Sequence, residues 1–91
     1  MARVVVSLKI MPDGVDANLK AIADASSKMI ADFGGKVGKV EEQPVAFGLK
    51  AVVIMFILDE ARGSTEELEK QVAQIPNVQS VDVIDVRRTI G

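Results

Sequence analysis

The sequence predicts an α+β fold in which four strands form one antiparallel sheet and two helices pack on one of its faces. Four segments have the alternating or continuous apolar pattern of strands, at residues 3–10, 36–42, 49–58 and 78–86. Between the first and second strands, and between the third and fourth, apolar residues recur at helical spacing. The order is therefore β-α-β-β-α-β, and two right-handed β-α-β units most simply form such a sheet.

The first strand alternates apolar with mixed residues, which predicts one buried face. The helix after it carries an apolar stripe that begins near Asp16 and ends at Phe33. Asp16 or Asp13 is the expected N-cap, because a side-chain oxygen there accepts a hydrogen bond from a free backbone N–H of the first turn. Gly34 and Gly35 are expected to end the helix, since glycine tolerates the left-handed conformation found at helix C-termini.

Two strands in the middle of the chain differ in the strength of their pattern. Residues 36–42 give a weak pattern, and residues 44–48 interrupt it before the most apolar segment, residues 49–58. That segment is apolar on both faces, as expected for a central strand. The first and third strands are therefore expected at the centre of a ferredoxin-like sandwich, whose other sheet face is largely open and partly apolar.

A short helix and a last strand complete the chain. Ser64 and Glu67 have the spacing of a capping box, which predicts a helix start there. The apolar stripe of this helix consists of Leu68, Val72 and Ile75. Pro76 ends the helix, and the last strand is predicted at residues 78–86.

The composition limits the chemistry that the chain can perform. Its 91 residues are expected to form one domain, residues 1–91, and they include no cysteine and no histidine. The commonest general base and the commonest metal ligands are therefore missing, and the absence of cysteine fits a reducing cytoplasm. The longest apolar run, residues 51–58, is too short to span a membrane. A net charge of −2 and only three aromatic residues, all phenylalanine, argue against direct nucleic-acid binding.

No group of residues has the pattern of an active site or a cofactor site. The adjacent carboxylates Glu41-Glu42 and Asp59-Glu60 are candidates for acid–base catalysis, but such pairs in turns far more often form a solvated edge. The glycines do not form a phosphate-binding loop, which requires a glycine-rich turn that opens directly into a helix. We therefore expect a binding protein without catalytic residues, cofactor or metal.

Two segments have the features of binding surfaces. In the loop before the third strand, Phe47 is followed by Gly48 and then Lys50, which places an aromatic side chain at the mouth of a hairpin. Phe47 either faces a partner or folds back into the core. Near the end of the chain, Arg87 and Arg88 follow the last predicted strand and begin a free tail. These two cations either reach into a partner or serve only for solubility.

Both segments resemble the archaeal elongation factor 1-beta family. The resemblance is carried by residues 44–50 (Pro-Val-Ala-Phe-Gly-Leu-Lys), by the apolar strand after them, and by residues 78–83 (Val-Gln-Ser-Val-Asp-Val), which lead into the arginine pair. The sequence is also similar to the C-terminal exchange domain of the eukaryotic counterparts, and the likeness spans essentially the whole chain. It implies a guanine-nucleotide exchange factor for elongation factor 1-alpha, the GTPase that brings aminoacyl-tRNA to the ribosome.

The resemblance also implies roles for particular residues. Counted from the shared Gln79-Ser80, Arg88 falls on a lysine that in the family reaches into the Mg²⁺ and phosphate site of the GTPase. Arg88 is therefore implied as the group that disturbs this site, with Arg87 as its neighbour. The further partner contacts implied by the resemblance are Phe47, Gly48 and Lys50. The sequence departs from the family pattern in having arginine at this position, whose forked guanidinium suits pairing with a carboxylate of the GTPase, and in continuing through residues 89–91.

A regulatory module of the same fold that binds a small ligand, an amino acid, is the alternative function. Such a module would hold its ligand at a turn between strand and helix, here near residues 12–14 (Pro-Asp-Gly). Binding of free amino acids in equilibrium dialysis would distinguish this alternative from an exchange factor.

Overall fold

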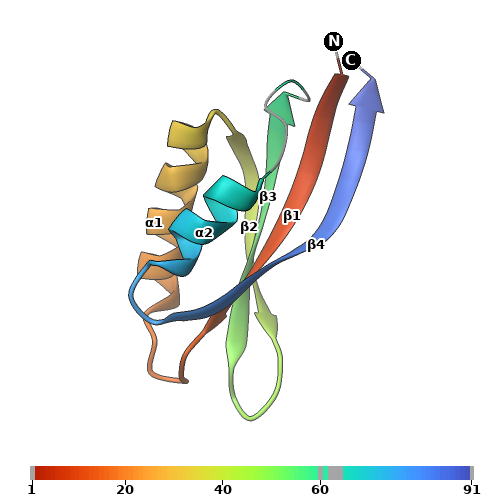
Figure 1. Cartoon of the computed structure of the whole chain (residues 1–91). Helices are drawn as coiled ribbons and strands as arrows, with labels where there is room; N and C mark the ends of the chain where they lie inside the picture. Colours follow the sequence, from red (N-terminus) through yellow and green to blue (C-terminus); the bar gives the residue numbers. More distant parts are fainter. Residues whose placement is uncertain (1, 60, 62–64, 91) are drawn as a thin grey trace.

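The fold has the predicted order of strands and helices. The computed structural model describes residues 2–59, 61 and 65–90 of the chain. In chain order its elements are β1 (Ala2–Pro12), α1 (Leu19–Phe33), β2 (Lys36–Pro44), β3 (Lys50–Asp59), α2 (Glu66–Ala73) and β4 (Val78–Ile90). The strands form one antiparallel sheet in the order β2-β3-β1-β4, and both helices lie on the same face of it (Figure 1). The first and third strands are therefore central, which confirms the predicted ferredoxin-like sandwich.

The core lies between the sheet and the two helices. Every second residue of β1 points into it, so that Leu8 and Ile10 have no exposed surface. The strand register sets these two residues against Ile54 and Val52 of β3, which are also buried. The helices contribute the buried residues Ile22, Ile30, Leu68 and Val72. Neither helix in the described part of the chain has the length and hydropathy needed to cross a membrane.

Helix α1 begins later than the sequence pattern predicts. Its N-cap is Asn18, whose Oδ1 accepts a hydrogen bond from the backbone N–H of Ala21 at 3.1 Å. The prediction of Asp16 or Asp13 as N-cap is wrong, because both residues belong to the turn that leads from β1 into the helix. The predicted C-terminus is confirmed, since Gly34 has a left-handed φ of 104° and its N–H donates to carbonyl groups of the last turn.

Helix α2 begins next to residues outside the described part of the chain, and the predicted cap Ser64 is one of them. Thr65 occupies the N-cap position without a side-chain hydrogen bond to the backbone. Its Oγ1 donates instead to Oε2 of Glu69 at 3.0 Å. The predicted apolar stripe is confirmed, since Leu68 and Val72 are fully buried.

Strand β4 is longer than the sequence pattern predicts. It runs to Ile90 and pairs with β1, with Arg87 set against Val5 and Arg88 against Val4. The prediction of a free tail after residue 86 is therefore wrong. The reason is tertiary, because the first residues of β1 supply a hydrogen-bonding partner for this polar segment. The beginning of β1 and the end of β4 lie side by side at one end of the sheet (Figure 1).

Candidate partner-binding site

The residues singled out from the sequence occupy opposite ends of the molecule. Phe47, Gly48 and Lys50 belong to the hairpin between β2 and β3 at one end, and Arg87 and Arg88 lie near the end of β4 at the other (Figure 1). The molecule measures 42 × 21 × 17 Å, and the two segments lie at the two ends of its long axis. The structure therefore gathers the residues within each segment but keeps the two segments apart.

The hairpin loop contains a turn with two residues in the left-handed conformation. The backbone N–H of Leu49 donates to the carbonyl of Ala46 at 2.9 Å, and the two residues between them, Phe47 and Gly48, have φ values of 54° and 78°. Positive φ at both central positions is the signature of a type I′ turn, which is common in hairpins. Glycine adopts this conformation freely, whereas for phenylalanine it is uncommon and strained.

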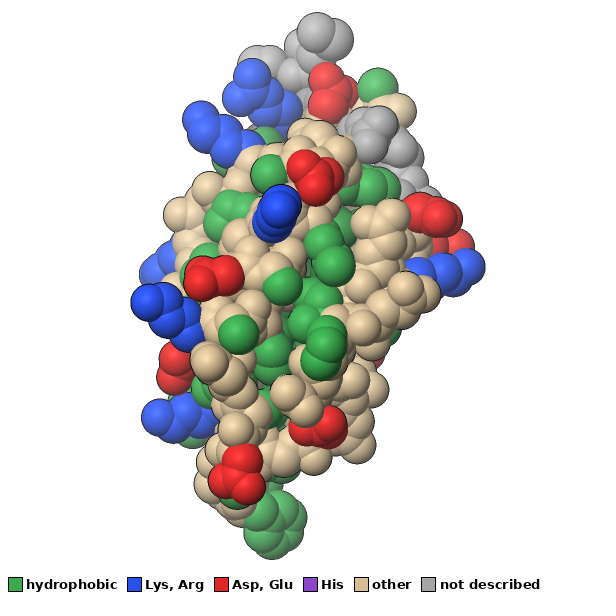
Figure 2. Space-filling view, turned by 90° about the vertical axis from the view of Figure 1, so that its left-hand side faces the viewer, with side chains coloured by type: hydrophobic (Ala, Val, Ile, Leu, Met, Phe, Trp, Pro, Cys, Tyr) green, Lys and Arg blue, Asp and Glu red, His purple; other side chains and the backbone are tan. Residues whose placement is uncertain are grey.

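The side chain of Phe47 gains nothing from burial that would offset this strain. It is 97% exposed, so the interpretation of Phe47 as a core residue is wrong. In Figure 2 a hydrophobic group protrudes at the lower end of the molecule, where Figure 1 places the hairpin loop. Neither the strained backbone nor the large apolar side chain held in solvent stabilises the free protein.

The two arginines of β4 lie on opposite faces of the sheet. Side chains alternate along a strand, and the register sets Val86 against Val6, a residue of the core face. Arg88 therefore lies on the helix-bearing face, as Val86 does, and Arg87 lies on the open face. The Nε of Arg87 donates to Oδ2 of Asp85 at 2.9 Å on that open face.

The surface around Arg88 is partly apolar. Val86 is 57% exposed although it lies on the core face of the sheet, because the helices do not reach the end of β4 (Figure 1). Val86 and Arg88 are two residues apart on one strand, so their side chains are neighbours. Val4 pairs with Arg88 across the ladder and packs at the edge of the core. This end of the sheet therefore presents a cation beside exposed apolar surface.

The sheet face opposite the helices carries a mixture of apolar and charged side chains. Met55 in its centre is 36% exposed. Ion pairs lie on both edge strands of this face, from Lys39 to Glu41 at 2.8 Å on β2 and from Arg87 to Asp85 at 2.9 Å on β4. A hydrogen bond from Lys39 to Glu41, and then the charge of that carboxylate, raise the pKa of the Lys39 ammonium above its ordinary value.

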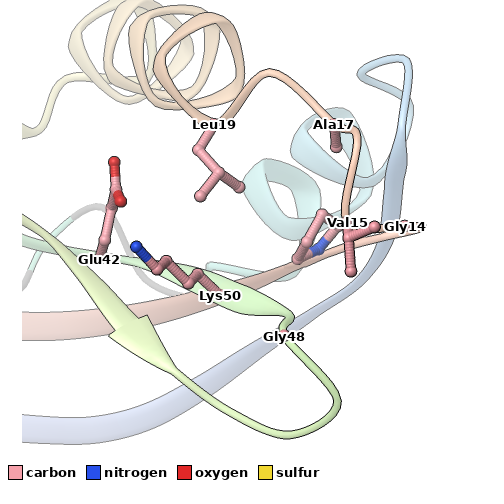
Figure 3. Close-up of a pocket in the computed structure, with 8 residues that line it drawn as sticks. Gly14, Val15, Ala17, Leu19, Glu42, Gly48 and Lys50 are labelled. Atoms are coloured by element: carbon pink, nitrogen blue, oxygen red, sulfur yellow. The ribbon is translucent and has the colours of Figure 1, made fainter.

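A pocket of about 230 Å³ lies between the base of the hairpin and the turn that leads into α1 (Figure 3). Val15 and Leu19 line it on the side of the turn, and Glu42, Gly48 and Lys50 line it on the side of the hairpin. Gly48 and Lys50 are residues that the sequence singled out. The pocket also borders residues 12–14, where the amino-acid-binding alternative places its ligand.

Glu42, expected from the sequence to belong to a solvated edge, lines this pocket, a place that the sequence pattern did not predict. The register sets Glu42 of β2 against Val52 of β3, and Val52 belongs to the core face. The side chain of Glu42 therefore lies on the helix-bearing face of the sheet, whereas Glu41 lies on the open face. The face that each glutamate occupies depends on the register between β2 and β3, and the sequence alone does not determine that register.

Solved structures with the same fold have little sequence in common with this chain. The ACT domain from the GTP pyrophosphokinase of Chlorobium tepidum matches with a TM-score of 0.60 and 12% identity, over 88% of this chain and 96% of that one. The de novo designed protein Foldit4 matches with a TM-score of 0.61 and 18% identity, over 98% of both chains. At such identities these likenesses show the fold alone.

Curated relatives with higher identity are archaeal proteins. Elongation factor 1-beta of Methanobrevibacter smithii is 40% identical over 89 residues, which cover 97% of this chain and 98% of that protein. Elongation factor 1-beta of Methanocella arvoryzae is 41% identical over 83 residues, with 91% and 92% covered. The family model of the EF-1 guanine nucleotide exchange domain matches residues 5–89, a range that includes the hairpin and both arginines. This chain therefore belongs to the elongation factor 1-beta family and carries its guanine nucleotide exchange domain.

Proposed function

We propose that the protein promotes the exchange of GDP for GTP on elongation factor 1-alpha in the cytoplasm, by binding alone and without a cofactor. The match of residues 5–89 to the EF-1 guanine nucleotide exchange domain carries this proposal. Exchange requires no acid, base or nucleophile, because GDP is held by phosphate-loop contacts and Mg²⁺ that need only be disturbed. The exchange factor must bind the disturbed form of the GTPase more tightly than the GDP-bound form.

We assign the disturbing contact to Arg88. Pairing between β4 and β1 holds its backbone, so the guanidinium extends from a strand instead of a mobile tail. A guanidinium forms two parallel hydrogen bonds with a carboxylate, so Arg88 suits a carboxylate of the GTPase that otherwise holds Mg²⁺ in place. Arg87 is the second candidate, because the count from Gln79-Ser80 places the family's lysine at Arg88 and Arg87 lies on the other face of the sheet, where its Nε donates to Asp85.

The hairpin end supplies affinity in this proposal. The exposed ring of Phe47 is an apolar anchor of the kind found at the centre of protein interfaces. Because the hairpin and Arg88 lie at opposite ends of a molecule 42 Å long, one partner must present two separate contact surfaces. The contact of Phe47 therefore lies far from the nucleotide site that Arg88 reaches.

The energies required are modest. A thousandfold acceleration of GDP release corresponds to about 4 kcal/mol of preferential stabilisation on the path to release. Hydrogen bonds to charged groups contribute about 1.5 to 3 kcal/mol each, so a bidentate contact of Arg88 supplies a large part of that amount.

The test is the release of a fluorescent GDP analogue from archaeal elongation factor 1-alpha at fixed Mg²⁺ concentration. We expect strong acceleration by the wild-type protein and loss of most of it in Arg88→Ala, with binding largely retained. Arg87→Ala removes a neighbouring arginine from the other sheet face, and we expect a clearly smaller loss. Equal losses in the two variants would contradict the assignment to Arg88. If the wild-type protein does not accelerate release, the proposed function is wrong.

A further inference from the structure

The pocket beside the hairpin contains two opposite charges that are not paired with each other. Lys50 of β3 and Glu42 of β2 both extend into it, and the Lys50 ammonium is directed toward the side of Glu42 (Figure 3). In the part of the chain that the structure describes, neither side chain takes part in an ion pair. The register sets Lys50 against Pro44, two residues from Glu42, so the two side chains lie diagonally on one face of the sheet. An ammonium and a carboxylate therefore point into the same opening.

The opposite wall of the pocket is apolar and borders the hairpin turn. Leu19 and Val15 form this wall, and Val15 is 64% exposed. A Cβ added to Gly48 would lie 3.7 Å from Cγ1 of Val15, so the turn and this wall meet at the rim of the pocket. The exposed Phe47 directly precedes Gly48 of the pocket lining, so an aromatic residue adjoins the rim of the pocket.

The two charges determine which chemical group fits between them. A singly charged group in the pocket would be attracted by one of the two side chains and repelled by the other. A dipolar group avoids this conflict. A peptide bond or a carboxamide accepts a hydrogen bond from the Lys50 ammonium through its oxygen and donates one to the Glu42 carboxylate through its N–H.

We propose that this pocket receives a peptide or carboxamide group of elongation factor 1-alpha, on a segment that packs against Val15 and continues to Phe47. The proposal rests on the proposed function, because the partner is the GTPase that Phe47 anchors. The aromatic ring contributes buried apolar area, and the pocket fixes the direction in which the partner segment crosses the hairpin end. Glu42 and Lys50 are thus binding residues that act as a pair.

The test compares the dissociation constants of four variants for nucleotide-free elongation factor 1-alpha, measured by isothermal titration calorimetry. Lys50→Gln and Glu42→Gln each remove one charge, and we expect both to weaken binding, by about five- to twentyfold. Lys36→Gln and Glu41→Gln make the same changes in net charge outside the pocket, and we expect both to stay within about twofold of wild type. All four side chains are exposed, so the variants are expected to fold.

The signs of the two effects decide the outcome. If one pocket variant weakens binding and the other strengthens it, the occupant carries a single charge and the dipolar assignment is wrong. If neither changes binding while wild-type exchange is intact, the pocket is no contact site and the proposed function still holds. No binding by the wild-type protein would overturn the proposed function as well. The alternative occupant, a free amino acid, is tested by titrating the free protein with glycine and leucine. Saturable binding that is lost in both Lys50→Gln and Glu42→Gln would assign the pocket to amino acids instead.

Discussion

Replacing Phe47 with asparagine is expected to stabilise the free protein and to weaken its binding to elongation factor 1-alpha. The left-handed backbone, with φ at 54°, costs an ordinary side chain about 1 kcal/mol or more. Asparagine tolerates this region, and Asn-Gly is the favoured pair for a type I′ turn. Because Phe47 is 97% exposed, its removal sacrifices almost no buried area. We therefore expect the free energy of unfolding to rise by about 0.5 to 1 kcal/mol, or the melting temperature by about 2 to 8 °C.

Binding is expected to change in the opposite direction. Full burial of a phenylalanine side chain contributes about 1.5 to 3 kcal/mol. Its loss in Phe47→Asn therefore corresponds to about a ten- to hundredfold increase in the dissociation constant. Urea unfolding measures the first effect and isothermal titration calorimetry with the GTPase the second. Val45→Asn is the matched control for stability, since Val45 lies in the same loop without a positive φ. A Phe47→Asn protein that is less stable than wild type would refute the strain argument, and unchanged binding would refute the anchor.

Two further predictions concern packing around the helices. Ser26→Ala is expected to raise the free energy of unfolding by about 1 kcal/mol, because its fully buried Oγ has no hydrogen-bond partner among the described residues. Urea unfolding measures this free energy, with Ser27→Ala at a half-buried position as the control. A lower free energy of unfolding for Ser26→Ala would contradict the prediction, since it would mean that Oγ makes a stabilising hydrogen bond. Gly35→Ala is expected to destabilise by about 1 to 3 kcal/mol, since its Cβ would lie 2.8 Å from Cγ2 of Ile30. A Cβ at Gly38 would have only a backbone oxygen near it, at 3.6 Å, so the melting temperature of Gly38→Ala is expected to stay close to that of wild type. Equal melting temperatures of the two variants would contradict the steric argument.

The order of elements was predictable because it depends on the hydrophobic pattern, which alternates in β1 and is a continuous apolar run in β3. The end of α1 was predictable for a backbone reason, since Gly34 adopts a conformation that few other residues accept. The start of α1 was not predictable in the same way. Asn18 and Asp16 are both good capping residues, and the choice between them depends on how the turn after β1 closes. One contact in that turn is from the N–H of Asp13 to the carbonyl of Asn77, at 2.8 Å, which joins segments far apart in the sequence.

The charged pocket was partly visible in the sequence. Lys50 was singled out by its place in the hairpin, but Glu42 has the same local pattern as the neighbouring Glu41. Only the pairing of β2 with β3 separates the two carboxylates, because a shift by one residue would exchange their faces. The exposure of Phe47 was also undecided, since an aromatic residue before a glycine suits a buried or an exposed turn equally well. The structure decides it, since the Phe47 side chain is exposed at the type I′ turn.

The length of β4 matters most for the proposed mechanism. A free tail would let Arg88 search a wide volume around the end of the sheet, and its contact with the GTPase would then cost the entropy of ordering that tail. The ladder with β1 removes much of this cost, because the backbone of Arg88 is already ordered in the free protein. It also fixes the distance between Arg88 and the hairpin at the other end of the long axis. In the proposed function, a GTPase anchored by Phe47 would therefore meet the guanidinium at a defined position, and the affinity gained at the hairpin would help to place the cation at the nucleotide site.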